Sequence, residues 1–190
     1  TGIQKPDLDW RYLIFHLPYA FHGKRVFTEI YSLENNLSYS TPEEQKAVAK
    51  SEGYIAFINE KIEPSQRASS EIGNMYTASI FMALLSALQV SFNNEEELKG
   101  QKIGFLAYGS GSKAKVFAGT VNESWKEVVS KWDIFNVLNQ RKAIDFDIYE
   151  NLHLKKLENS VYPDYQGFGL KSVELESPVL KGARYYQYQR

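Results

Sequence analysis

The sequence contains no cysteine. This absence excludes disulfide bonds, thiolate metal sites and a cysteine nucleophile within these residues. No apolar run is long enough to span a bilayer, because Ser, Thr and Gln interrupt the longest one. The formal net charge is −1, so no overall field attracts nucleic acid or an anionic membrane. Any site for an anion must therefore be local.

The sequence also lacks a starting Met and a basic segment followed by an apolar one, which is the pattern of a secretory signal. We therefore expect a piece of a longer protein that acts in the cytoplasm. Hydrophobic residues make up 43% and aromatic residues 14% of the 190 positions, which is enough for a core. A chain of this length predicts one domain spanning residues 1–190.

Short apolar and β-branched runs predict strands, and periodic stretches with polar caps predict helices. Strands are expected at 12–15, 102–108 and 115–121, the last two joined as a hairpin, with one or two more within 173–188. Helices are expected at 20–33, 73–90 and 144–154, and residues 125–141 should be mostly helical. A further helix should begin at Pro42, with Thr41 as its N-cap. Residues 53–59 fit either a strand or a helix.

The predicted helix at 73–90 is apolar on more than one face. A helix that is apolar all round is buried on all sides, which is unusual in a small domain with a single sheet. This pattern favours a helix in the middle layer of a larger stack, between two sheets. In the 190 residues alone, one face of this helix should be exposed.

Three polar residues lie at predicted strand or helix ends, and each has a structural as well as a functional interpretation. His16 ends the first strand, where it either bonds to backbone or handles protons and donates to a carbonyl oxygen. Asn74 begins the apolar helix, as an N-cap or as a substrate contact beside free N–H groups. Ser110 lies between two glycines, in a simple hairpin turn or close to a ligand. Spacing alone favours the structural role for each of them.

The segments that carry these residues read FHLPY at 15–19, GNMYTAS at 73–79 and YGSGS at 108–112. In this order they resemble the C-terminal half of the 3-hydroxy-3-methylglutaryl-CoA synthases, condensing enzymes of the thiolase superfamily. The resemblance implies an α/β fold, the C-terminal half of a thiolase-like architecture, with a mixed sheet and a buried central helix. Residues 1–190 would be this half-domain, with the N-terminal half absent.

The resemblance also implies roles for the site residues. His16 would bind the acetoacetyl-CoA carbonyl and stabilise charge developing on it, Asn74 would contact the acyl substrate, and Ser110 would hydrogen-bond its carboxylate or hydroxyl group. Family members carry basic residues five and nine positions after the histidine, and here those positions hold Phe21 and Arg25. Arg25 keeps the charge that binds CoA, and Lys24 could replace the charge that Phe21 lacks.

Family enzymes acetylate a cysteine, form an acetyl enolate with the help of a glutamate, and add it to acetoacetyl-CoA. The cysteine and glutamate belong to the N-terminal half, so this chain should supply half a site and be inactive alone. The resemblance implies coenzyme A thioesters as substrates, no tightly bound cofactor, no metal, a homodimer, and a place in the mevalonate pathway of isoprenoid biosynthesis.

Three alternatives stay open at this point. One is a synthase of the same family that adds branches to polyketide chains on a carrier protein, which Phe21 would fit. Another is an enzyme of the ketoacyl synthase III type, and the third is a non-catalytic thiolase-like scaffold. A cysteine and a glutamate in the upstream sequence would exclude the scaffold.

Overall fold

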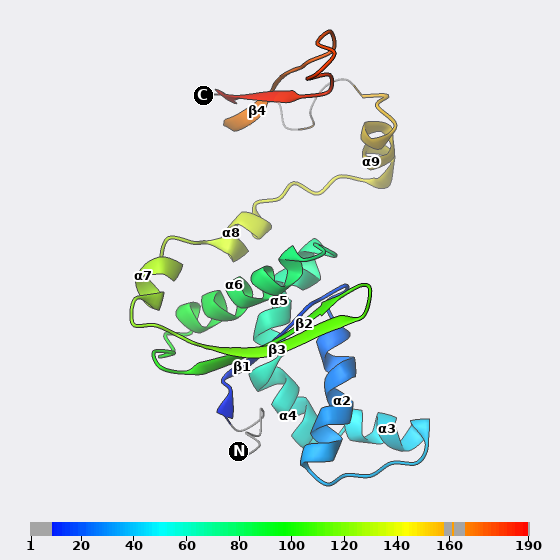
Figure 1. Cartoon of the computed structure of the whole chain (residues 1–190), viewed down its shortest axis with the longest axis vertical. Helices are drawn as coiled ribbons and strands as arrows, with labels where there is room; N and C mark the ends of the chain where they lie inside the picture. The colour runs from blue at the N-terminus through cyan, green and yellow to red at the C-terminus, as the bar shows by residue number, and fades with distance from the viewer. Residues whose placement is uncertain (1–8, 158–160, 162–165, 190) are drawn as a thin grey trace. The chain divides into compact units, whose positions relative to one another are not determined.

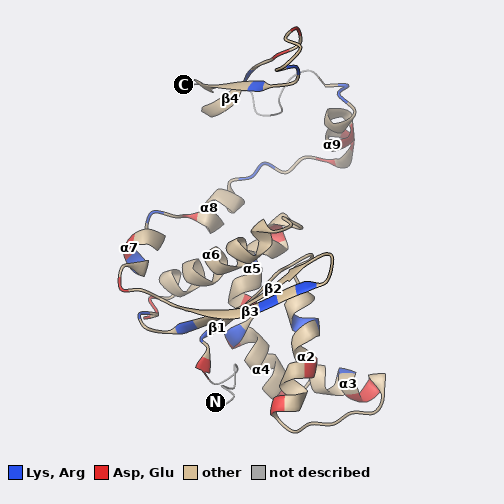
Figure 2. Cartoon of the chain, in the orientation of Figure 1, with Lys and Arg blue, Asp and Glu red and all other residues tan. Residues whose placement is uncertain are grey.

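The computed structural model describes residues 9–157, 161 and 166–189, in two compact units divided after Arg141 (Figure 1). The first unit holds a three-stranded sheet with helices around it, and the second holds a helix and a two-stranded sheet. Basic and acidic side chains are interspersed along both units (Figure 2).

The sheet of the first unit is mixed. Strand β1 (Tyr12–Phe15) pairs in parallel with β2 (Lys102–Gly109), and β2 forms an antiparallel hairpin with β3 (Lys113–Thr120). All four residues of β1 are buried, as expected for a continuous apolar run covered on both faces. The strands predicted at 12–15 and 102–108 and the hairpin are confirmed.

Seven helices of the first unit lie around this sheet within the described residues. They are α2 (His22–Glu34), α3 (Pro42–Ala49), α4 (Glu52–Lys61), α5 (Glu63–Ile72), α6 (Ala78–Asn93), α7 (Trp125–Val129) and α8 (Ile134–Asn139). The predicted start of α3 is confirmed, since Thr41 Oγ1 accepts the Glu44 N–H and Pro42 opens the helix. Residues 53–59 are helical. The stretch 125–141 is mostly helical, as predicted, but it forms two short helices, because α7 ends at Val129 and Asp133 takes a non-helical conformation before α8.

Helix α6 packs against α5 and contacts β1 (Figure 1). Its small and polar residues, including Ser79, Ala83, Ser86 and Ala87, are buried. Its opposite face is partly open to solvent, where Phe81 is 63% exposed. The exposed face expected for this helix in the 190 residues is therefore present.

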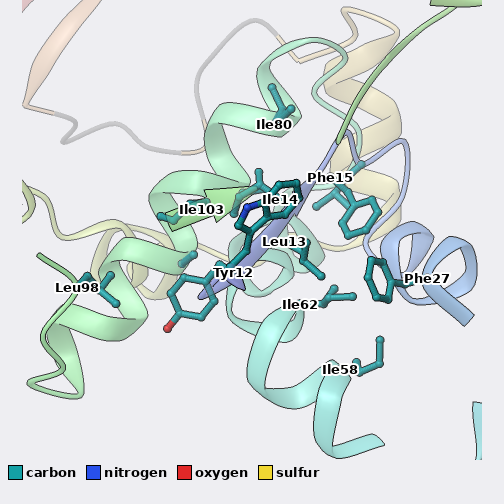
Figure 3. Close-up of a cluster of buried hydrophobic side chains, with 14 of the residues drawn as sticks. Tyr12, Leu13, Ile14, Phe15, Phe27, Ile58, Ile62, Ile80, Leu98 and Ile103 are labelled. Carbon is teal, nitrogen blue, oxygen red and sulfur yellow. The ribbon is translucent and has the colours of Figure 1, made fainter. Parts of the chain in front are cut away.

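The main core forms where β1 meets its covering helices (Figure 3). Leu13 and Ile14 are fully buried, and Phe15 makes an edge-to-face contact with Phe27 of α2 at 6.0 Å between ring centroids. Burial of β1 on both faces fixes the direction in which its last residues leave the sheet. The residue that follows β1 is His16.

In the second unit, α9 (Phe146–His153) precedes β4 (Gly167–Val173) and β5 (Arg184–Gln189), which pair antiparallel. The helix expected at 144–154 is confirmed, and Asp145 caps it by accepting the Ile148 N–H. The closing strands expected within 173–188 begin earlier, at Gly167. Among the described residues of both units, no helix is long and apolar enough to cross a membrane.

Candidate active site

His16 lies immediately beyond β1, and its backbone N–H donates to Leu106 O of β2 at 3.1 Å. Its imidazole is half-buried, and Nδ1 lies 3.1 Å from Ser79 Oγ in the first turn of α6. The same Oγ accepts the backbone N–H of Leu17 at 3.0 Å. A single buried hydroxyl therefore joins the end of β1 to the start of α6.

Asn74 is not the N-cap of the apolar helix, so that expectation is wrong. Gly73 ends α5 with φ +90°, and Asn74 Oδ1 accepts the Tyr76 N–H at 2.8 Å in a local turn. The helix begins only after Thr77, which makes no side-chain cap. Asn74 is exposed and lies five residues before Ser79, at the end of α6 that contacts His16.

Ser110 is exposed in the turn between β2 and β3. Gly111 there has φ +94°, a conformation that favours glycine, so the glycines of this segment serve the turn itself. Leu106, which bonds the His16 backbone, lies four residues earlier on the strand that leads to Ser110. His16 and Ser110 thus lie at the same end of the sheet, and Asn74 lies in the turn before α6. Among the described side chains of these three residues, only that of His16 hydrogen-bonds to α6. That they face one cavity stays a prediction.

Helix α2 presents the basic residues expected to bind an anion. Arg25 is exposed, and Lys24 places its ammonium 5.4 Å from the centre of the Phe21 ring. A cavity of about 290 Å³ between α2 and α4 is lined by both Lys24 and Arg25. A second cavity, of about 420 Å³, shares Arg25 and adds Lys46 of α3, and no carboxylate lines either cavity within the described residues.

His22, at the first position of α2, lies near His16. Burial lowers the pKa of His22, and the nearby His16 and Arg25 lower it further. Tyr19 packs edge-on against its ring at 5.3 Å, and within the described part of the chain its buried Nδ1 has no hydrogen-bond partner. A histidine at the first position of a helix gives no signal in sequence that would reveal this contact.

No cluster of three or more His, Asp or Glu in the described ranges could hold a metal ion. The arrangement offers a half-buried imidazole, a turn with an exposed amide, a glycine-flanked hydroxyl and a hollow lined by cations. These groups can bind a carbonyl oxygen and an anionic substrate. None of them is a thiolate, so a thioester intermediate on cysteine needs a residue from outside this chain.

A mixed sheet with a partly buried helix, α6, packed against its strand β1 fits a thiolase-like arrangement, and comparison with solved structures supports this class. The chain superimposes over its whole length on MvaS in complex with 3-hydroxy-3-methylglutaryl coenzyme A, with a TM-score of 0.71 and 29% identity. It covers 44% of that protein. A synthase of curacin biosynthesis, solved with a holo donor carrier protein, has the same fold with a TM-score of 0.71 at 19% identity.

The family model for the hydroxymethylglutaryl-coenzyme A synthase C terminal matches residues 20–166, so the chain belongs to this family. A hydroxymethylglutaryl-CoA synthase from Haloferax volcanii is 29% identical over 179 residues, and one from Schizosaccharomyces pombe is 30% identical over 173 residues. These matches cover 80% and 76% of this chain. The chain spans about 40% of the length of these relatives.

Proposed function

We propose that this chain supplies the carbonyl-binding half of the active site of a hydroxymethylglutaryl-CoA synthase. The full protein would condense acetyl-CoA with acetoacetyl-CoA and water to give 3-hydroxy-3-methylglutaryl-CoA and free CoA. The observation that carries the proposal is the position of His16, held at the junction of β1, β2 and α6 in a chain of this family.

In the proposed reaction, the acetyl group is first transferred to a cysteine outside this chain. A glutamate, also outside it, removes a proton from the acetyl methyl group, and the resulting enolate attacks C3 of acetoacetyl-CoA. The C3 carbonyl oxygen gains negative charge as the carbon–carbon bond forms. His16 would donate a hydrogen bond to this oxygen, which stabilises the transition state more than the ground state. Water then cleaves the thioester to the cysteine and releases the product.

The remaining site residues would bind the substrate. Asn74 would contact the acyl group, and Ser110 would hydrogen-bond the carboxylate or hydroxyl group without attacking it. Arg25, with Lys24, would bind the anionic part of CoA, and the cation-lined hollow beside α2 supports this assignment. In this proposal CoA thioesters act as substrates, and no other cofactor takes part.

The proposed partner of this chain is the rest of the protein, which would carry the cysteine and the glutamate. The exposed side of α6, around Phe81, is the face that we expect this part to cover. A homodimer of the full protein belongs to the same proposal.

The test uses the full-length protein and separates its two half-reactions. His16→Ala should leave acetylation of the cysteine by acetyl-CoA intact and lower the rate of condensation at least about 100-fold. His153→Ala is the matched control, because His153 is an exposed histidine of α9 that stacks on Tyr149. A His16→Ala protein that condenses at the wild-type rate would remove the basis of the proposal.

A second candidate function is favoured by Phe21. Phe21 is 61% exposed and stands at the position where family members carry a basic residue. The missing positive charge would weaken the binding of free CoA. A synthase that takes acyl groups from a carrier protein would need this charge less. Activity with acetoacetyl groups on carrier protein well above that with acetoacetyl-CoA would favour this alternative.

A further inference from the structure

Ser79 lies behind His16 and occupies an unusual position for a hydroxyl group. It is completely buried in the first turn of α6, and its Oγ has two partners among the described residues. One is the backbone N–H of Leu17 at 3.0 Å, and the other is His16 Nδ1 at 3.1 Å. The two bonds come from consecutive residues of the segment that follows β1.

The proton of the hydroxyl decides how these bonds are arranged. The Leu17 N–H can only donate, so Ser79 Oγ accepts there. If His16 Nδ1 carried a proton and donated as well, the buried O–H would lack an acceptor among the described residues. An unpaired buried donor is costly. If Nδ1 instead accepts the O–H, every group is satisfied, and the proton of the neutral imidazole lies on Nε2.

We infer that Ser79 is a positioning residue that donates its hydroxyl proton to His16 Nδ1 and so holds the neutral imidazole with its proton on Nε2. This inference rests on the proposed function and deepens it. The imidazole then presents a donor at Nε2, which is what an oxygen gaining negative charge requires. A proton on Nδ1 would make Nε2 an acceptor and oppose that charge.

The same hydroxyl also fixes the ring in space. Because Ser79 Oγ anchors the Leu17 backbone as well as the His16 ring, it holds the imidazole and its supporting backbone on one rigid point of α6. Pro18 restricts Leu17 to extended geometry, which adds to this rigidity. The orientation of the donor is thereby set before the substrate binds.

The test is ¹⁵N NMR of histidine-labelled full-length protein, since the shifts of the two ring nitrogens distinguish the tautomers. The His16 signals are assigned with His16→Gln and followed through a pH titration to identify the neutral form. We expect the proton on Nε2 in the wild type. A wild-type His16 with its proton on Nδ1 would overturn the inference, even if His16→Ala still abolished condensation. Loss of the proposed function would appear instead as a fully active His16→Ala protein.

Variants of Ser79 give the second measurement. Ser79→Thr and Ser79→Val add the same bulk, but only Thr keeps the hydroxyl, so Thr should retain condensation and Val should lower kcat about tenfold or more relative to Thr. The KM for acetoacetyl-CoA should change less than kcat. Equal kcat values for the Thr and Val proteins, with both folded, would contradict the assigned role.

Ser86→Ala is the control for stability. Ser86 is also a buried serine of α6, and its Oγ likewise accepts a backbone N–H, from Ala68 at 3.1 Å, while donating to Pro64 O. Its loss should destabilise the fold by a similar mechanism but leave the His16 tautomer and kcat unchanged. A fall in kcat as large as that of Ser79→Val would show that the effect is only structural.

Discussion

Replacing Gly23 with Ala tests how closely α2 must approach β1. A Cβ at Gly23 would lie 2.6 Å from Gln66 Nε2 and 2.9 Å from Phe15 Cδ2. An ordinary contact begins at 3.4 Å, so the distance from the added methyl group must increase by about 0.8 Å to the amide and by about 0.5 Å to the ring. The Gln66 amide can rotate, but Phe15 is 3% exposed and packed against Phe27, so α2 itself must move outward.

The magnitude follows from two opposing effects. Overpacking of a core costs about 1–3 kcal/mol, while Ala is about 1 kcal/mol more favourable than Gly inside a helix. Gly23→Ala should therefore destabilise the fold by about 0–2 kcal/mol. Gly53→Ala in α4 is the control, because the only atom near its added Cβ in the described part of the chain is Tyr31 Oη at 2.9 Å, the far end of a partly exposed side chain. That variant should stabilise by about 0.5–1 kcal/mol.

The assay is thermal unfolding of the full-length protein, with kinetics measured below the transition. Because α2 carries Arg25, the outward shift should also raise KM for the CoA substrate in Gly23→Ala, and Gly53→Ala should leave it unchanged. If Gly23→Ala stabilises the protein as much as Gly53→Ala does, α2 does not press on β1 as described, and the reasoning is refuted.

Three further predictions follow from the structure. Arg25→Ala in the full protein should raise KM for acetoacetyl-CoA about tenfold or more, because a charge-assisted contact of roughly 1.5–3 kcal/mol is lost. Phe21→Lys should lower this KM, and an unchanged KM in Arg25→Ala would contradict the proposal that Arg25 binds the anionic part of CoA. Hydrogen bonds from the Lys99 backbone N–H and from the Trp125 and Lys126 side chains lower the pKa of Glu97 from 4.5 to about 2. The stabilising effect of Glu97 is therefore present above pH 4.5 and is lost as pH falls through 2, and Glu97→Gln should flatten the dependence of Tm on acid pH in this range. The isolated chain should self-associate through the exposed side of α6, as measured by sedimentation, and Phe81→Glu should weaken this self-association. Adding the N-terminal half should suppress it, and a chain that stays monomeric at high concentration would contradict the interpretation as half of a protein.

The sequence predicted the elements whose signals are local. The run at 12–15 is apolar throughout, and the glycines at 109 and 111 mark a turn, so the strand and the hairpin were found within a residue or two. The helix at 73–90 was placed too early, because its apolar pattern continues through a turn. In that turn Gly73 and Tyr76 both have positive φ, which no periodicity reveals.

The candidate site was predictable in its residues but not in its contacts. The family motif singled out His16, because its position at the end of an apolar strand alone favours a structural role. Ser79 did not stand out, since a serine in the first turn of a helix is ordinary. The two residues are separated by 63 positions, and only the packing of α6 on β1 brings them together. His22 lies near His16 for a local reason, because α2 begins only six positions after it.

The hydrogen bonds described for His16 come from Ser79 and Leu106 of this chain, whereas the nucleophile cannot come from it, because the chain has no cysteine. If the proposed function holds, the two chemical tasks of the condensation are divided between two structural parts. Binding and polarising the carbonyl depend on β1, β2 and α6, and they should persist when the nucleophile is replaced in the full protein. A protein with serine in place of that cysteine should thus still bind acetoacetyl-CoA and lose this affinity when His16 is also changed. Acyl transfer, in contrast, depends on how the rest of the protein covers the exposed side of α6, so changes at Phe81 should act on both half-reactions, while changes at Ser79 act on condensation alone.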